Sequence, residues 1–256
     1  MATKKKVALS FRGGGARRTA YVGVLQALEE EGIKIDGFIG ASAGAMVGAA
    51  YSLGKTPDEI LDYAREFYVR KLMNYKIWKQ PFSIVDENKF QNYVNNFLGD
   101  QDIKDCEIET FIELTNYKTG KQIIVDRGPV DLLLTATSAA PMFMRPVTVN
   151  GELCFDGDLD HSMHTKFLRQ RGYDIVLAFM ADKDVSVESS NLVKTIHTLE
   201  DKVTEIELEY EPPDFLLRNI GGGANFMDFR SIEEPYNIAY EKTKASMNQI
   251  KALLDS

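Results

Sequence analysis

Cysteine and histidine are scarce in this sequence of 256 residues. Its two cysteines, Cys106 and Cys154, are too few for a disulfide framework or a cysteine-based metal site. The three histidines are His161, His164 and His197, so a serine–histidine–aspartate triad would have few candidate members. We predict that the protein binds no metal ion and no other cofactor.

The sequence also lacks a long apolar run and an excess of positive charge. No run approaches the length of a membrane-spanning helix, and residues 1–11 (MATKKKVALSF) are basic without the apolar core of a signal peptide. The net charge of −8 argues against nucleic acid as a partner, because phosphate contacts need a basic surface. It also argues against strong attraction to anionic membranes. We expect a cytoplasmic protein.

Residues 7–54 predict a strand, a loop, a helix, a second strand, a second loop and a second helix. Their two apolar runs, 7–11 and 37–41, each end in a loop of small residues, and a helical pattern follows each loop. The carboxyl ends of parallel strands meet at one edge of an α/β sheet. We therefore expect both loops to lie together at that edge.

The second loop, residues 40–44 (GASAG), has the Gly-x-Ser-x-Gly pattern of a nucleophile elbow. Such a turn holds its serine in a strained, exposed conformation, and Gly40 and Gly44 let the turn close and the substrate approach. Ser42 would begin a helix, where free N–H groups favour developing negative charge, and the N–H of Ala43 is a candidate oxyanion donor. The pattern alone is also common in ordinary tight turns.

The first loop contains the glycine triplet Gly13, Gly14 and Gly15. Its backbone N–H groups can point at the same position, as an oxyanion hole for acyl transfer requires. A glycine loop can also hold a dinucleotide, but Arg18 stands where the third glycine of G-x-G-x-x-G belongs. No P-loop pattern occurs. A nucleotide-binding domain therefore remains the weaker alternative.

The rest of the chain continues the α/β pattern without a repeat or a linker before about residue 185. We predict an α/β core at 1–185 and a helical extension at 186–256 packed on the same domain. The further expected helices are 58–70, 86–98, 129–138, 163–170, 191–210 and 235–253, and the further expected strands are 106–115, 122–125, 146–149, 152–155 and 174–180. Residues 211–230 are expected to be irregular. The apolar insert at 72–85 is expected to fill the core, with an acyl pocket or lid as the alternative.

Asp156 is the best candidate for the base that accepts the Ser42 proton. It ends a predicted strand, and Gly157 allows a sharp turn after it. An aspartate is ordinarily a weak base, but desolvation would raise its pKa and favour direct proton transfer from the serine. The alternative is that Asp156 only caps its own turn. His197 lies in a predicted surface helix and is a poor candidate.

Four motifs in this order resemble the motif set of patatin-like phospholipases: residues 13–17 (GGGAR), 40–44 (GASAG), 138–141 (SAAP) and 156–157 (DG). The resemblance covers roughly residues 7–180. It implies a three-layer α/β/α fold with a mostly parallel central sheet. It also implies a serine–aspartate dyad that hydrolyses acyl esters of lipids without a metal.

The resemblance matches Ser42 with the family nucleophile and Asp156 with the family base. It matches the glycine triplet with the oxyanion loop and Arg17 with the basic residue that ends this loop. The expected oxyanion and substrate-binding residues are thus Gly13, Gly14, Gly15, Arg17 and Ala43. The expected support of the elbow and turn comes from Gly40, Gly44, Gly157 and Asp158. The implied partners are a lipid or other acyl ester and, in peripheral contact, a membrane; the oligomeric state stays open.

The sequence departs from the family pattern at three places. Arg18 replaces a glycine and puts a bulky cation near the oxyanion loop, and Asp158 replaces a small residue. Residues 160–164 (DHSMH) replace a segment that contains asparagine and proline. A second carboxylate would raise the pKa of Asp156, whereas Arg18 or a protonated His161 would lower it. We expect a lipid acyl hydrolase, of the phospholipase A type or the lysophospholipase type, with altered substrate choice. The alternative is an inactive or regulated relative that binds lipid or a partner protein.

Overall fold

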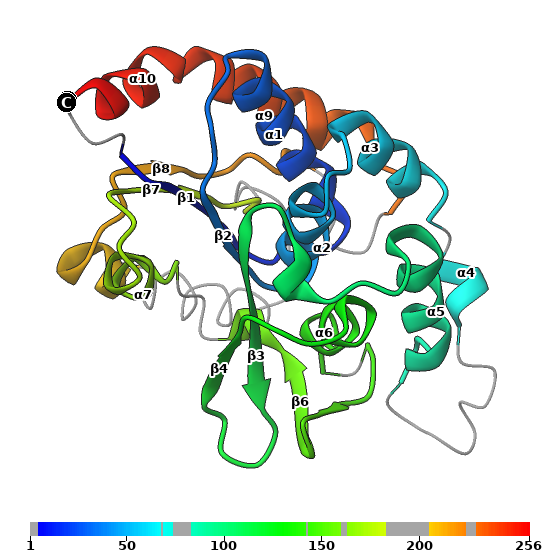
Figure 1. Ribbon diagram of the computed structural model, residues 1–256. Coiled ribbons are helices and arrows are strands. Elements are labelled where there is room, and N and C mark those ends of the chain that lie inside the picture. The colour runs from blue at the N-terminus through cyan, green and yellow to red at the C-terminus, as the bar shows by residue number, and fades with distance from the viewer. Residues whose placement is uncertain are drawn as a thin grey trace.

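The computed structural model describes residues 5–67, 69–73, 83–141, 143–159, 163–182, 205–223 and 229–256. Within these residues one eight-stranded mixed sheet forms the centre of the molecule, in the order β5-β6-β3-β2-β1-β7-β8 with β4 paired to β3. Helices cover both faces of this sheet (Figure 1). The three-layer α/β/α fold expected from the sequence is therefore confirmed.

The parallel half of the sheet positions both predicted loops. Its strands are β1 (Val7–Phe11), β2 (Gly37–Gly40), β3 (Glu109–Asn116), β7 (Ile175–Phe179) and β8 (Phe215–Leu217). The central strand is β1, which pairs in parallel with β2 on one side and β7 on the other. Phe11 pairs with Gly40, so the glycine loop and the elbow leave the sheet at the same edge.

The antiparallel half begins at β3 and brings in the predicted base. Its strands are β4 (Gln122–Val125), β5 (Val147–Val149) and β6 (Glu152–Asp156). A hairpin with Asn150 and Gly151 at its turn joins β5 to β6, and both turn residues have positive φ, as a type I′ turn requires. Asp156 at the end of β6 pairs with Leu114 of β3.

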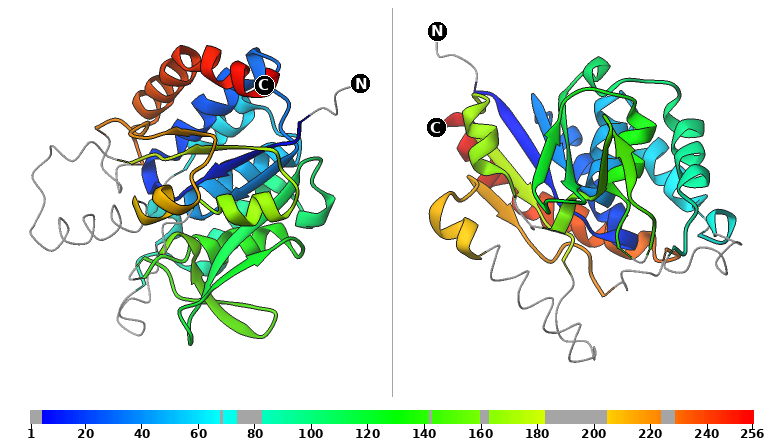
Figure 2. Two further views of the ribbon diagram at one scale, coloured as in Figure 1. Left: turned by 90° about the vertical axis from the view of Figure 1, so that its left-hand side faces the viewer. Right: turned by 90° about the horizontal axis from the view of Figure 1, so that it is seen from below.

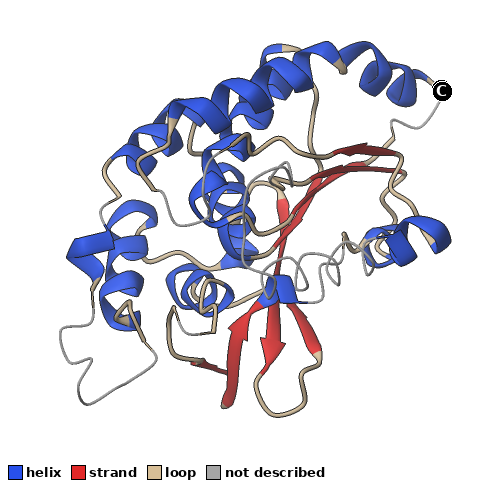
Figure 3. Ribbon diagram, turned by 180° about the vertical axis from the view of Figure 1, so that it is seen from behind, coloured by secondary structure: helices blue, strands red, loops and turns tan. Residues whose placement is uncertain are grey.

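The helices divide between the two faces of the sheet (Figure 3). Their bounds are α1 (Thr19–Glu30), α2 (Ser42–Ser52), α3 (Pro57–Arg65), α4 (Val69–Leu72), α5 (Glu87–Leu98), α6 (Val130–Thr137), α7 (Thr165–Gln170), α9 (Glu233–Ala245) and α10 (Met247–Asp255). Short 3-10 turns occupy Gly15–Arg18, Ile103–Asp105 and Gly157–Leu159. Successive residues of β1 point to opposite faces of the sheet, and each face has its own hydrophobic cluster. Leu9 packs in the larger cluster with residues of α1, and Ala8 packs in the smaller cluster with Leu168 of α7.

The C-terminal helices pack against the first helix of the chain (Figure 2). A Cβ atom on Gly23 of α1 would lie 2.3 Å from the backbone oxygen of Tyr236 in α9, so the two helices meet at a position without room for a side chain. The hydroxyl of Thr19 donates to the carbonyl of Ile232 at 2.8 Å. This contact joins the segment after residue 186 to the core.

Two expectations for the C-terminal segment are wrong in detail. Residues 215–217 form β8 within a stretch expected to be irregular, and Asp214 supports this strand by accepting the N–H of Val176 at 2.7 Å. The final helix is divided at Ser246, whose hydroxyl donates to the carbonyl of Lys242 at 2.9 Å, a local bond that bends or ends helices. Residues 205–210 are helical, and the rest of the helix expected at 191–210 lies outside the described residues.

The apolar insert is described only at its two ends. Met73 and Val85 form an antiparallel bridge there, and residues 74–82 lie outside the described residues. Across the described ranges, no helix combines the length and the apolar character needed to cross a membrane.

Candidate active site

Ser42 occupies a strained turn between β2 and α2. Its φ of 47° lies in the left-handed region that a side chain rarely adopts, as the nucleophile-elbow pattern predicts. The Ser42 N–H donates to the hydroxyl of Thr137 at 2.9 Å, and this hydroxyl donates to the carbonyl of Glu113 at 2.7 Å. Thr137 is completely buried. The strained backbone is therefore held by hydrogen bonds from α6 and β3, which sequence patterns did not indicate.

The glycines on either side of Ser42 are required by close packing. A Cβ atom on Gly44 would lie 2.4 Å from the backbone oxygen of Arg12 and 2.6 Å from that of Phe11. On Gly40 it would lie 2.6 Å from the Phe38 ring. The elbow thus packs directly on the end of β1, which brings Ser42 next to the glycine loop.

Asp156 is fixed by its backbone on both sides. Its N–H donates to the carbonyl of Ala139 at 3.2 Å, and its carbonyl accepts the hydroxyl of Thr115 at 2.8 Å. The next residue, Gly157, has no room for a side chain, since a Cβ atom would lie 2.1 Å from the Glu113 oxygen. The turn at 138–141 therefore holds the backbone of Asp156 through Ala139.

The Asp156 carboxyl group is buried beside Ser42, and its pKa is raised to about 7. Burial is the largest cause, and the nearby carboxylate of Asp158 raises the pKa further. Hydrogen bonds from the Asp158 N–H, at 2.9 Å, and from the Ser42 side chain act in the opposite direction. Because a base works best with a pKa near the operating pH, Asp156 is suited to accept a proton at neutral pH.

Asp158 connects the turn that follows Asp156 to the glycine loop. Its carboxylate forms an ion pair with Arg12 at 3.1 Å and accepts the N–H of Gly13. Burial raises the pKa of Asp158, and Arg12 is the main opposing influence. A Cβ atom on Gly13 would lie 2.3 Å from the Asp158 carboxylate, so this contact requires glycine. No motif in the sequence indicated Arg12, whose only local signal is its position between β1 and the triplet.

Gly13 is held from its carbonyl side as well. The carbonyl accepts the hydroxyl of Tyr21 at 2.7 Å, and this hydroxyl accepts the N–H of Ala181 at 3.2 Å. Tyr21 is completely buried and stacks on Phe11 with ring centroids 4.6 Å apart. Tyr21 therefore connects the glycine loop to the end of β7, another contact that the sequence patterns did not reveal.

Three backbone N–H groups near Ser42 have no acceptor among the described residues. They belong to Gly14, Gly15 and Ala43, the last of which lies in the first turn of α2. Arg17 shapes the loop, because its backbone N–H and its Nε donate to the Gly14 carbonyl at 3.0 and 3.3 Å. Unpaired N–H groups at this edge can bind an oxyanion.

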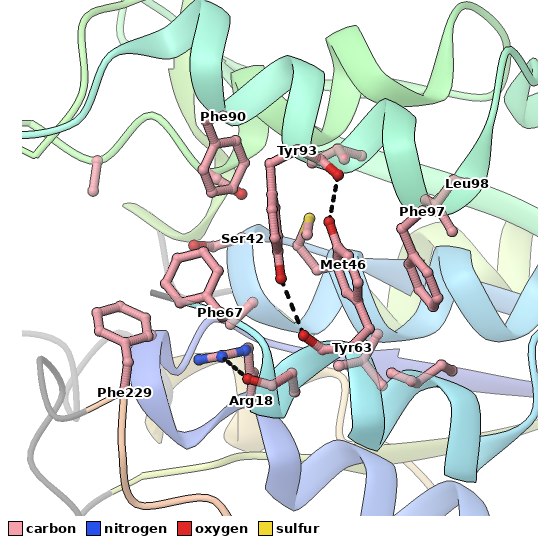
Figure 4. A pocket seen from close by; sticks show the side chains of 18 of the residues that line it. Arg18, Ser42, Met46, Tyr63, Phe67, Phe90, Tyr93, Phe97, Leu98 and Phe229 are labelled. Atoms are coloured by element: carbon pink, nitrogen blue, oxygen red, sulfur yellow. Dashed lines mark hydrogen bonds between the residues drawn. The ribbon is translucent and has the colours of Figure 1, made fainter. Parts of the chain in front are cut away.

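A pocket lined mainly by apolar side chains opens beside Ser42 and Asp156 (Figure 4). It encloses about 900 Å³, part of which is open solvent. Its apolar lining comes from Met46, Val47, Ile60, Phe67, Phe90, Val94, Phe97, Leu98, Phe143 and Phe229. Tyr63 and Tyr93 close one wall, where each hydroxyl donates to the other's carbonyl, at 2.5 and 3.1 Å. The lining comes mostly from α2, α3 and α5, and the described ends of the 72–85 insert do not contribute to it.

Arg18 is buried in the wall of this pocket. Its Nη2 donates to the carbonyl of Ala64 at 3.0 Å, and its guanidinium carbon lies 4.7 Å from the Phe67 ring centroid and 5.2 Å from that of Phe229. Burial lowers the pKa of Arg18 to about 10. The charge that acts on Asp156 comes from Asp158, so Arg18 does not have the expected lowering effect.

His164, the histidine that lies within the described residues, does not contact Ser42 or Asp156. The Nε2 of His164 lies 2.7 Å from the Glu113 carboxylate and 3.2 Å from Gln122 Nε2, within a buried cluster. His161 and His197 lie outside the described residues. Among the residues that are described, no group of three or more His, Cys, Asp or Glu could hold a metal ion.

The model of the family described as patatin-like phospholipase matches residues 9–159. An uncharacterised NTE family protein of Mycobacterium bovis is 33% identical over 157 residues, which are 60% of this chain and 43% of that protein. Lysophospholipase NTE1 of Pyricularia oryzae is 26% identical over 181 residues, 68% of this chain and 12% of that protein. The chain thus spans less than half the length of these relatives.

Two solved structures share the fold. VipD from Legionella pneumophila matches with a TM-score of 0.61 and 16% identity, over 99% of this chain and 67% of that chain. Human GIVD cytosolic phospholipase A2, in complex with methyl gamma-linolenyl fluorophosphonate, matches with a TM-score of 0.54 and 11% identity, over 98% of this chain and 58% of that chain. At these identities the likeness concerns the fold alone.

Proposed function

The chain belongs to the patatin-like phospholipase family, and from this premise we propose that it hydrolyses lipid acyl esters through a Ser42–Asp156 dyad. One observation carries the proposal. A serine with a strained backbone lies against a buried aspartate whose pKa is about 7, and both side chains line an apolar pocket. A nucleophile in contact with a base of suitable pKa, beside a site for an acyl chain, is the arrangement that ester hydrolysis requires.

The reaction proceeds through an acyl-enzyme. Asp156 accepts the Ser42 proton while the Ser42 oxygen attacks the ester carbonyl, and the tetrahedral oxyanion forms. Collapse of this intermediate breaks the ester bond, and the alcohol leaves with the proton from Asp156. Water then attacks the acyl-enzyme, with Asp156 accepting its proton and returning it to Ser42 as the carboxylic acid leaves.

The backbone donors that hold both oxyanions are those of Gly14, Gly15 and Ala43. Their N–H groups have no acceptor among the described residues and lie at the edge from which Ser42 projects. The N–H of Gly13 is directed at Asp158, so we assign Gly13 to the support of the loop. Arg17 has a supporting role as well, because it holds the Gly14 carbonyl.

The substrate class follows from the pocket. Its lining residues are mostly aliphatic and aromatic, and burial of each methylene group of an acyl chain contributes about 0.8 kcal/mol. The names of two family and fold relatives, a lysophospholipase and a cytosolic phospholipase A2, describe enzymes that act on lipids. Both features support a lipid acyl ester as the substrate.

A fluorophosphonate probe tests the proposed nucleophile directly. We expect one probe molecule per chain to attach to Ser42 in the wild type and none to attach in Ser42→Ala. Ser138→Ala is the matched control, because Ser138 lines the same pocket and should leave labelling unchanged. Intact-mass measurement and hydrolysis of p-nitrophenyl esters of increasing chain length give the two readouts. Labelling or hydrolysis that survives in Ser42→Ala would exclude Ser42 as the nucleophile.

The raised pKa of Asp156 sets the pH dependence of the reaction. The base acts in its deprotonated form, so kcat/KM should fall about tenfold per pH unit below a midpoint near 7 and level off above it. A p-nitrophenyl ester assayed between pH 5 and 9 gives this profile, with hydrolysis by buffer alone subtracted. A profile that is flat between pH 5 and 7 would contradict the assignment of Asp156 as the base.

A further inference from the structure

Arg17 fixes one peptide group of the glycine loop. Its backbone N–H and its Nε both donate to the Gly14 carbonyl, and the residue is only 8% exposed. The carbonyl of Gly14 and the N–H of Gly15 belong to one planar peptide group, in which they point in opposite directions. By holding this carbonyl, Arg17 also sets the direction of the Gly15 N–H, which is one of the proposed oxyanion donors.

The glycine loop needs such support from other parts of the chain. Glycine has the largest conformational freedom of any residue, and Gly15 has a φ of 55°, in the region that a side chain disfavours. The donors of an oxyanion hole are effective only if their direction is fixed before the reaction. Three successive glycines cannot fix that direction by themselves, so contacts from distant residues must do so.

The Arg17 side chain is packed against Gly221, near the carboxyl end of the chain. A Cβ atom on Gly221 would lie 2.6 Å from the Arg17 Cδ, and 2.7 Å from the backbone oxygen of Ala181. Gly221 is buried, and its φ lies outside the left-handed region. Glycine is therefore required here by lack of space. Ala181 also packs on the glycine loop, since a Cβ atom on Gly14 would lie 3.2 Å from its side chain.

The two residues before Gly221 anchor it to the sheet and to α9. Ile220 is completely buried in the core, and its N–H donates to the Met180 carbonyl at 3.4 Å. The Lys242 side chain of α9 donates to the Asn219 carbonyl at 2.8 Å. Gly221 thus has a fixed position against which the Arg17 side chain is held.

We propose that Gly221 is a positioning residue of the oxyanion hole. It leaves the space that Arg17 needs to reach the Gly14 carbonyl, and the Gly15 N–H is thereby directed at the oxyanion. This inference rests on the proposed hydrolase function and extends it beyond residues 9–159, which the family model matches. It gives the C-terminal segment a part in the reaction besides its packing on α1.

A purely structural role of Gly221 makes a different prediction. If Gly221 serves only to permit close packing, Gly221→Ala lowers stability, and the molecules that remain folded react at the normal rate. If Gly221 positions Arg17, the folded molecules react slowly, and they do so only while Arg17 is present. The two roles therefore differ in the kcat of the folded enzyme and in its dependence on Arg17.

The kinetic experiment measures kcat and KM for a p-nitrophenyl ester at a temperature where urea titration shows each variant to be folded. We expect Gly221→Ala to lower kcat about 10- to 100-fold, because a displaced oxyanion donor stabilises the transition state less. KM should change less than about threefold, since Gly221 does not line the pocket. Gly223→Ala is the matched control, because Gly223 is exposed and a Cβ atom there would lie at an ordinary 3.4 Å from the Glu234 carboxylate. A normal kcat in Gly221→Ala, or an equal loss in both variants, would overturn the proposal.

A double-mutant cycle tests whether Gly221 acts through Arg17. Arg17→Ala removes the Cδ atom that the added Cβ atom would approach, together with the side-chain hydrogen bond to Gly14. In this background the cost of Gly221→Ala in kcat should be about tenfold smaller than in the wild type. The contact with Ala181 remains in both backgrounds, so its cost cancels. Equal costs in both backgrounds would show that Gly221 acts independently of Arg17 and would overturn the proposal.

Nuclear magnetic resonance separates this inference from the hydrolase proposal, because it needs no reaction. The Arg17 Nε–H is buried and hydrogen-bonded, so its signal, identified by its loss in Arg17→Lys, should exchange slowly with water in the wild type. We expect exchange at least about tenfold faster in Gly221→Ala and unchanged in Gly223→Ala. This result without any hydrolysis by the wild type would refute the hydrolase and keep Gly221 as the residue that positions Arg17. Equal exchange in the wild type and in Gly221→Ala would overturn the proposal.

Discussion

The Asp156→Asn variant is expected to lose about 10²- to 10⁴-fold in kcat, the usual contribution of a general base. Asparagine keeps the shape of the side chain and an oxygen that can accept the Asp158 N–H, but it cannot take the Ser42 proton. Hydrolysis of a p-nitrophenyl ester by this variant, by Ser42→Ala and by the double variant gives the comparison. If the two residues act as a unit, the double variant is no worse than the poorer single variant.

The control for this prediction is the stability of the same variant. The folded-state pKa of Asp156 is raised, so its contribution to the free energy of unfolding is fully present below pH 4 and is lost as the pH rises through about 7. This loss amounts to up to about 4 kcal/mol, from a pKa near 7 against 3.8. Asp156→Asn should therefore unfold at a higher temperature than the wild type at pH 8. If Asp156→Asn instead unfolds at a lower temperature than the wild type, its loss of activity would be explained by a loss of stability.

The second large effect is expected for Gly44→Ala. Replacing a helical glycine by alanine ordinarily stabilises a protein, but here the new Cβ atom would lie within 2.6 Å of two backbone oxygens at the end of β1. We expect a loss of about 1–3 kcal/mol in the free energy of unfolding and a drop of about 100-fold in kcat, because Ser42 moves with the elbow.

Urea unfolding and fluorophosphonate labelling measure the two consequences of Gly44→Ala separately. Gln26→Ala is the control, since it introduces the same residue at a half-buried position of α1 and should leave stability nearly unchanged. Full stability with unaltered labelling in Gly44→Ala would contradict the close contact between the elbow and β1.

Local sequence patterns located the glycine loop and the Ser42 elbow, because each of them depends on residues that are adjacent in the sequence. The strand before Gly13, the elbow around Ser42 and the turn after Asp156 are each encoded by a short stretch of adjacent residues. The β–loop–α order of residues 7–54 then places the first two at one sheet edge. That is why the glycine triplet and the serine could be predicted to meet, whereas Asp156 was a candidate from its place at a strand end and from the family resemblance.

The contacts that hold the site together could not be predicted, because they join distant residues. Arg12 and Asp158 are 146 positions apart, and Tyr21 reaches Ala181 across 160 positions. Neither pair has a periodic or motif-like signal, since ion pairs and buried hydroxyls are satisfied by whichever group the fold brings near. For the same reason the sequence showed that Arg18 was unusual, but not that its side chain enters the pocket wall.

The position of β1 between β2 and β7 has a consequence for how the protein is made. During synthesis the chain emerges from its amino terminus, so β1, the glycine triplet and Ser42 appear long before Ile175, where β7 begins. Until that strand arrives, one edge of β1 has no partner, and the Tyr21 hydroxyl cannot meet Ala181. Pairing between strands so far apart in sequence is slow, and an unpaired apolar edge promotes aggregation. A nascent chain that contains both residues of the proposed dyad but ends before β7 would therefore depend on chaperones to keep this edge from aggregating.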